Sequence, residues 1–142
     1  MNQHAKSDCA AVLRQCERVF DPAHSPIYME AGEGGHLLPR AAEPGEIPAG
    51  FPKNLIEVRE LAGKGYSAML SLSLPQEYLT HPDLEAQAAR CGELSPEECA
   101  QFLLFAFRLT LRFGQEMFFD LWRRGAIKTA AVRLRQHLET GR

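Results

Sequence analysis

The most informative stretch of the chain runs from residue 95 to residue 125, where large apolar residues far outnumber a narrow stripe of polar ones. Ser95 is followed by Pro96 and, three residues later, by Glu98, a capping box that predicts the start of a helix. Gly125 comes directly after two arginines and predicts the end of that helix. A helix that is apolar over most of its circumference is covered on several sides. The pattern therefore predicts a long apolar central helix in the core.

The length of this predicted helix raises a difficulty. A continuous helix over residues 96–124 would be about 43 Å long, whereas a compact domain of this size is roughly 37 Å across. The helix must therefore either break or extend beyond the domain and meet a partner. Gly114 is the natural point for a break, because glycine costs about 1 kcal/mol relative to alanine inside a helix.

Residues 55–74 show a different periodicity. Apolar and small polar residues alternate from Tyr66 to Leu74, and a similar alternation over residues 55–61 precedes a glycine-rich segment. This pattern predicts an antiparallel β-hairpin at about 55–74. Leu55, Val58 and Leu61 also have helical spacing, so a helix over residues 52–62 is the competing interpretation. Residues 27–38 contain two short apolar runs around a glycine turn and could supply further strands.

The remaining segments complete an α+β prediction for a single domain over residues 1–142. An amphipathic pattern predicts an N-terminal helix that starts at Ser7 or Asp8 and ends near Phe20. A short helix is expected from residue 83 to about 91, and a last helix from about 126 to 138. Residues 39–52 are rich in proline and glycine and predict an irregular loop. The expected architecture is an N-terminal helix, a small antiparallel sheet and a helical C-terminal half.

Charge is distributed unevenly along the chain, although the net charge is only −2. From residue 121 onward there are six basic residues against the single acid Glu139. This excess predicts a surface that could bind an acidic protein partner. Nucleic acid is possible but not favoured, because the last helix has few side chains of the kinds that contact bases. The candidate partner-binding residues are Arg123, Arg124, Lys128, Arg133 and Arg135, of which Arg133 and Arg135 are expected to face water.

No motif in the sequence indicates a particular chemistry. The Gly63-Lys64-Gly65 segment lacks the glycine and the Ser/Thr that a phosphate-binding loop requires. The four cysteines form no Cys-x-x-Cys pair, and the five histidines include no pair at i, i+4. The sequence therefore predicts no catalytic residue, no metal site and no cofactor. It contains no signal-peptide pattern and no apolar run of membrane-spanning length, so a cytoplasmic location without membrane contact is expected.

These patterns favour a non-enzymatic interaction or regulatory protein. The central helix offers more apolar surface than the rest of the chain can cover, which predicts a homodimer. The residues expected at the dimer interface are Phe113, Met117, Phe118 and Trp122. The alternative function is a nucleic-acid-associated regulator that uses the basic C-terminal helix. A small-ligand binder or an enzyme is the third possibility.

Overall fold

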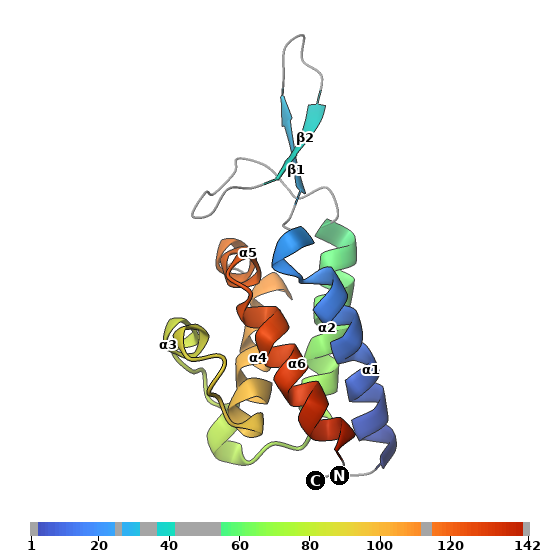
Figure 1. The fold of residues 1–142 in the computed structure, drawn as a ribbon, viewed down its shortest axis with the longest axis vertical. Coiled ribbons are helices and arrows are strands. Elements are labelled where there is room, and N and C mark those ends of the chain that lie inside the picture. Colours follow the sequence, from blue (N-terminus) through green and yellow to red (C-terminus); the bar gives the residue numbers. More distant parts are fainter. Residues whose placement is uncertain (1–2, 25–26, 32–36, 42–54, 112–114, 141–142) are drawn as a thin grey trace.

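Four helices form an antiparallel bundle (Figure 1). The computed structural model describes residues 3–24, 27–31, 37–41, 55–111 and 115–140. The bundle consists of α1 (Gln3–Val19), α2 (Leu55–Leu70), α4 (Pro96–Leu111) and α6 (Ala126–Glu139). Helices that are consecutive in this series pack against each other, and α6 closes the ring by packing against α1. Each helix runs antiparallel to both of its neighbours in the bundle (Figure 1).

Shorter elements surround the bundle. Helix α5 (Gln115–Arg123) lies at the end of the bundle where α1 ends, next to the short helix η1 (Pro22–His24). The short helix η3 (Gln76–Leu79) and helix α3 (Leu84–Ala89) pack against the outside of α4. Strands β1 (Ile27–Ala31) and β2 (Leu37–Ala41) pair antiparallel, with Met29 opposite Pro39, and project away from the helices (Figure 1).

The predicted α+β class is wrong, because the packed body of the described chain contains helices alone. The predicted hairpin at about 55–74 is also wrong, since α2 occupies residues 55–70 as one helix. The buried residues of this region follow helical spacing, and they are Val58, Leu61, Ala62, Gly65, Met69 and Leu72. The alternation from Tyr66 to Leu74 falls on the last turn of α2 and on the segment that follows it. The competing helical interpretation of residues 52–62 predicted the correct type of structure.

The prediction of one long apolar central helix is wrong as well. Helix α4 ends at Leu111 and α5 begins at Gln115, so the break suggested by the helix length is confirmed. The aromatic rings of Phe107 and Phe118 lie 6.4 Å apart, whereas eleven residues along a continuous helix span about 16 Å. Helix α5 therefore packs back against the end of α4 and does not extend it. Gly114 lies outside the described residues.

Several local predictions are confirmed. The capping box is present: Ser95 Oγ accepts a hydrogen bond from the backbone N–H of Glu98 (3.1 Å), and Glu98 Oε1 accepts one from the N–H of Ser95 (3.0 Å). Gly125 has a φ of 81°, in the left-handed region, and separates α5 from α6. The short helix expected from residue 83 to about 91 is present as α3, and Asp83 caps it by accepting a hydrogen bond from the N–H of Ala86 (3.1 Å). Helix α4 is a core helix as expected, with every residue from 99 to 107 buried.

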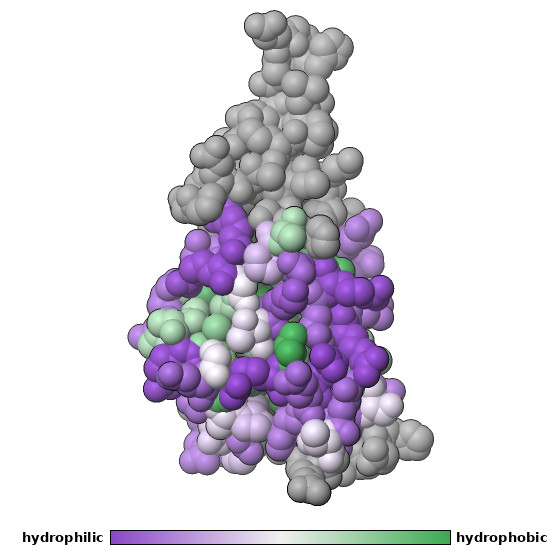
Figure 2. Space-filling model, viewed as in Figure 1, coloured by the Kyte–Doolittle hydropathy of each residue, from purple (hydrophilic) through white to green (hydrophobic). Residues whose placement is uncertain are grey.

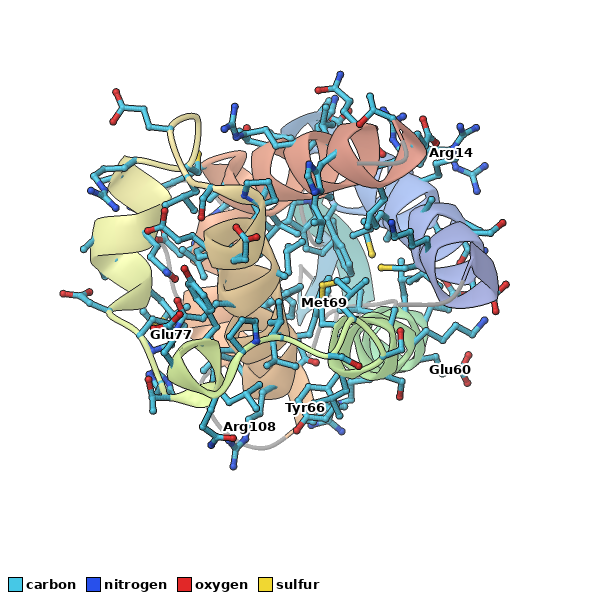
Figure 3. The ribbon with its side chains drawn as sticks, turned by 90° about the horizontal axis from the view of Figure 1, so that it is seen from below. Arg14, Glu60, Tyr66, Met69, Glu77 and Arg108 are labelled. Carbon is cyan, nitrogen blue, oxygen red and sulfur yellow. The ribbon has the colours of Figure 1, made fainter. Side chains whose placement is uncertain are left out.

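The polar and apolar faces of the helices separate cleanly. A view along the bundle shows Met69 between the helices, whereas Arg14 and Glu60 point outward (Figure 3). The face shown in Figure 2 is largely hydrophilic, with small hydrophobic areas between the charged side chains.

No helix in the described part of the chain has both the length and the apolar character of a membrane span. Of the predicted irregular loop at 39–52, residues 39–41 belong to β2 and the rest lie outside the described residues.

Candidate functional site: an apolar cleft at one end of the bundle

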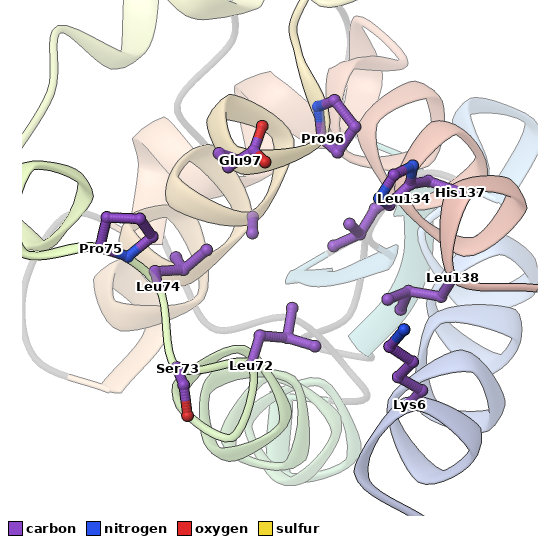
Figure 4. A pocket seen from close by; sticks show the side chains of 11 residues that line it. Lys6, Leu72, Ser73, Leu74, Pro75, Pro96, Glu97, Leu134, His137 and Leu138 are labelled. Atoms are coloured by element: carbon purple, nitrogen blue, oxygen red, sulfur yellow. The ribbon is translucent and has the colours of Figure 1, made fainter. Parts of the chain in front are cut away.

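The two ends of the bundle are covered differently. At the end where α1 finishes, the aromatic residues of α5 pack on Phe20 and Phe107 and close the core. At the opposite end, α1 and α4 begin and α2 and α6 finish, and a cleft of about 230 Å³ opens between them (Figure 4). We call this the end cleft. Its lining residues are Lys6, Leu72, Ser73, Leu74, Pro75, Pro96, Glu97, Ala100, Leu134, His137 and Leu138.

The floor of the end cleft is the hydrophobic core itself. Leu72, Ala100, Leu134 and Leu138 are all buried members of the central core cluster, and all four also line the cleft. Half-buried Leu74 packs against the same cluster. A ligand in the cleft would therefore contact the side chains that hold the four helices together.

A strained residue lies at the rim of the cleft. Ser73 has a φ of 54°, the only positive φ of a non-glycine residue in the described chain. This conformation costs a serine about 1 kcal/mol or more. It follows the last turn of α2, where the N–H groups of Leu72 and Ser73 donate to the carbonyls of Met69 and Leu70. The turn directs the chain so that Leu72 joins the floor and Leu74 forms a wall.

Three ionisable side chains lie around this apolar cleft. The amino group of Lys6 points toward the cleft, and Glu97 lies on the opposite side of it (Figure 4). His137 comes from the last turn of α6. Lys6 forms no hydrogen bond or ion pair with another described residue. The first turn of α4 also meets the cleft through Pro96, and the start of a helix carries a partial positive charge.

The size and lining of the cleft define what it can bind. Pockets for drug-sized ligands and large cofactors usually have volumes of about 300–1,000 Å³, and an apolar cavity of about 150 Å³ holds one benzene ring. A volume of about 230 Å³ therefore suits one large side chain or a small apolar molecule. Within the described residues, no group of three potential metal ligands comes together in this cleft or elsewhere.

The predicted partner-binding cations do not form one continuous basic surface. Arg124 pairs with Glu85 (2.9 Å) and with Asp120 (3.2 Å), and Lys128 pairs with Asp21 (2.6 Å). The side chain of Arg123 is mostly buried, with an amino group 3.8 Å from Asp120. These three residues lie near the junction of α5 and α6.

The other two cations of this set lie farther along α6, and each contacts a different part of the chain. Arg133 donates a hydrogen bond to the backbone carbonyl of Leu94 (2.7 Å). Arg135 pairs with Glu17 of α1 and with Glu139 of its own helix (3.0 Å). The acids that neutralise the basic C-terminal helix therefore come largely from distant parts of the same chain.

The residues predicted for a dimer interface lie mostly inside a single chain. Phe118 is 0% exposed and Trp122 is 1% exposed. Their rings lie 5.2 Å and 5.1 Å from that of Phe20, and Trp122 Nε1 donates to the carbonyl of Asp21 (2.8 Å). Met117 is half-buried against the core, and Phe113 lies outside the described residues.

Two of the four cysteines lie in the core of the bundle, on α1. Cys9 and Cys16 are fully buried, and burial raises the pKa of each thiol to about 12. Both thiols are therefore protonated and poor nucleophiles near neutral pH. His81 lies against the ring of Phe105, with 5.1 Å between the ring centroids.

Sequence reasoning missed the end cleft, because its residues come from four separate segments of the chain. Leu72, Ser73 and Leu74 were assigned to a strand, which hid the turn that ends α2. The signal that could have found it is the Ser-Leu-Ser-Leu-Pro segment over residues 71–75, where Pro75 ends any regular element.

Comparisons of the chain with protein-family models, with curated proteins and with solved structures find no match. A function must therefore be argued from the residues of this chain.

Proposed function

We propose that this protein is a non-enzymatic interaction protein that binds an apolar side chain of a partner protein in the end cleft. The observation that carries the proposal is the open end of the bundle, where core residues form the floor of a cleft. The opposite end of the same bundle is closed by five aromatic rings, from Phe20, Phe107, Phe118, Phe119 and Trp122.

The physical basis of the proposal is the release of water from an apolar surface. Pockets that accept one buried anchor side chain provide much of the affinity in protein–protein interfaces. Burying a large apolar side chain contributes about 1.5–3 kcal/mol. The end cleft has the size for one such anchor, and Leu72, Leu134 and Leu138 would contact it directly.

The alternative of a nucleic-acid-associated regulator is less well supported than binding in the end cleft, because most of the C-terminal cations have partners within the chain. Binding to a phosphate backbone needs lysine and arginine side chains that can reach phosphates. Arg124, Lys128 and Arg135 each have a carboxylate partner within the chain. An acidic protein partner would have to compete with the same intramolecular pairs.

Self-association stays a prediction. It no longer draws support from Phe118 and Trp122, which are buried within one chain. The large apolar residues that are exposed in the described chain are Val19, Leu70, Leu79 and Leu111. The mass in solution from light scattering would decide between one chain and two.

The proposal can be tested by filling the cleft. Ala100 is buried at its floor, so Ala100→Leu places three additional carbons in the space that the anchor would occupy. We suggest ten-residue glycine–serine peptides that carry a single Leu, Phe or Ala, titrated into the protein and followed in ¹H–¹⁵N spectra. We expect the Leu and Phe peptides to shift resonances of cleft residues, and Ala100→Leu to weaken this binding by at least about tenfold.

The matched control is Ala89→Leu, the same substitution at an exposed position on α3 outside the cleft. It should leave peptide binding unchanged. Binding that does not distinguish Leu and Phe from Ala, or that survives Ala100→Leu, would contradict the proposal.

A further inference from the structure

We infer that the anchor is the carboxy-terminal residue of the partner chain, whose carboxylate pairs with Lys6 while its apolar side chain enters the end cleft. This inference rests on the proposed function and adds to it the chemistry of the partner. It depends on the charge of the cleft and on the way the helix ends surround it.

Lys6 differs from the other cations near this end of the bundle. Arg14 pairs with Glu139, and Arg90 lies 3.5 Å from a carboxylate oxygen of Glu98. Lys6 is half-buried, its amino group points toward the cleft, and it has no hydrogen-bond or ion-pair partner among the described residues (Figure 4). An ammonium beside an apolar surface gains from a carboxylate that arrives together with an apolar group.

The other charges around the cleft are of mixed sign, because α1 and α4 begin there with partial positive charge, whereas α2 and α6 end there with partial negative charge. The partial positive charge at the start of α4 lies on the Pro96 side of the cleft. Glu97 opposes an anionic ligand, but it lies across the cleft from Lys6 and is exposed to water (Figure 4). Charges in water are screened more strongly than half-buried ones, so Lys6 has the larger influence inside the cleft. His137, from the last turn of α6, is the third polar side chain beside the cleft.

The surroundings of the cleft favour a chain end over an internal segment. Ends of all four bundle helices surround the space (Figure 4). An internal segment would have to pass over this rim on both sides of its anchor. A terminal residue needs only one path out, and its free carboxylate gives it the charge that Lys6 recognises. Capture of a C-terminal carboxylate is an established mode of peptide recognition.

The experiment compares two forms of one peptide. A glycine–serine peptide that ends in leucine is prepared with a free carboxylate and with a C-terminal amide, and both are titrated into the wild-type protein. We expect the free acid to bind about tenfold more tightly, because only the acid carries a negative charge that can form an ion pair with the ammonium of Lys6. In Lys6→Gln, the ratio between acid and amide should fall below about twofold.

Lys64→Gln is the matched control, since Lys64 is an exposed lysine of α2 outside the cleft. It should keep the tenfold preference for the acid, as should Lys6→Arg. The thermal midpoints of all three variants report whether each one folds.

The outcomes separate this inference from the proposed function. Equal binding of acid and amide, with both lost in Ala100→Leu, would overturn the C-terminal anchor and leave the cleft as a binding site. No binding of either peptide would overturn both. N-acetyl-leucine is the third probe. If it binds as tightly as the peptide acid, the site recognises small apolar acids and the inference of a partner chain is wrong.

Discussion

At the scale of single residues, two glycines of α2 have opposite surroundings. A Cβ atom on Gly65 would lie 2.5 Å from Cε2 of Phe107, a fully buried ring that Phe20 and Phe118 also contact. A Cβ atom on Gly63 would meet nothing within 4 Å. Gly65 therefore permits the close packing of α2 on α4, whereas Gly63 only lowers the helix propensity.

We predict opposite effects for the same substitution at these two positions. Gly65→Ala should lower the free energy of unfolding by about 1–3 kcal/mol, because the ring of Phe107 is fully buried beside Phe20 and Phe118 and would have to shift. Gly63→Ala should raise it by up to about 1 kcal/mol. Urea denaturation of both variants gives the comparison. Stabilisation by both would mean that α2 and α4 are farther apart than the structure shows.

At the scale of elements, an ion pair joins the first and last helices of the bundle. Arg135 of α6 donates through Nη2 to Glu17 of α1 (3.1 Å) and through Nη1 to Glu139 (3.0 Å). The side chains of Arg135 and Glu17 are only 19% and 16% exposed. The sequence placed Arg135 on a face toward water, but the partner that covers it lies 118 residues away.

We predict that Arg135→Glu lowers the free energy of unfolding by about 2 kcal/mol, between the values for exposed and buried ion pairs. The substitution replaces the cation between Glu17 and Glu139 by a third carboxylate, and the three carboxylates repel one another. Adding Glu17→Arg restores an opposite pair between α1 and α6 and should recover most of the loss. Chemical denaturation of the single and double variants measures both effects. A double variant that is no more stable than Arg135→Glu would show that the pair does not couple the helices.

At the scale of the whole molecule, an aromatic cluster joins three helices at one end of the bundle. Phe118 of α5 contacts Phe20 from the end of α1 (5.2 Å between ring centroids) and Phe107 of α4 (6.4 Å). All three side chains are fully buried. The cluster closes this end of the core, which explains why the apolar residues of α5 are not available on the surface.

We predict that Phe118→Ala lowers the free energy of unfolding by about 3–5 kcal/mol, as for other large aromatic residues in cores. This loss is a large fraction of the whole free energy of unfolding of a domain, which is about 5–15 kcal/mol. Leu70→Ala is the control. Leu70 is 50% exposed, so this substitution should lower the free energy of unfolding by less than about 0.5 kcal/mol. Similar losses for the two variants would contradict the closed aromatic end.

The local features of the fold were readable from the sequence because each depends on a few neighbouring residues. The capping box of Ser95 and Glu98 sets the start of α4 through hydrogen bonds three residues apart. Gly125 sets the start of α6 through its own backbone conformation. The amphipathic face of α1 follows from the 3.6-residue period, with Cys9, Leu13 and Cys16 all buried.

Tertiary structure decided the features that depend on distant residues. Residues 55–74 satisfy both a period of two and a helical period, and the packing of Gly65 on Phe107 and of Met69 in the core favours the helix. Likewise, the sequence shows which residues of the C-terminal helix are basic, but only the fold brings Asp21 to Lys128 and Glu17 to Arg135.

The end cleft belongs to the same class of feature. Its floor and rim come from α1, α4, α6 and the segment after α2, and no local pattern relates these segments to one another. The sequence determined the cap that starts α4, the glycine between α5 and α6, and the apolar face of α6. Only the assembly of four helices decided which end of the core is closed by aromatic rings and which is left open, because the free energy of burial depends on neighbours in space.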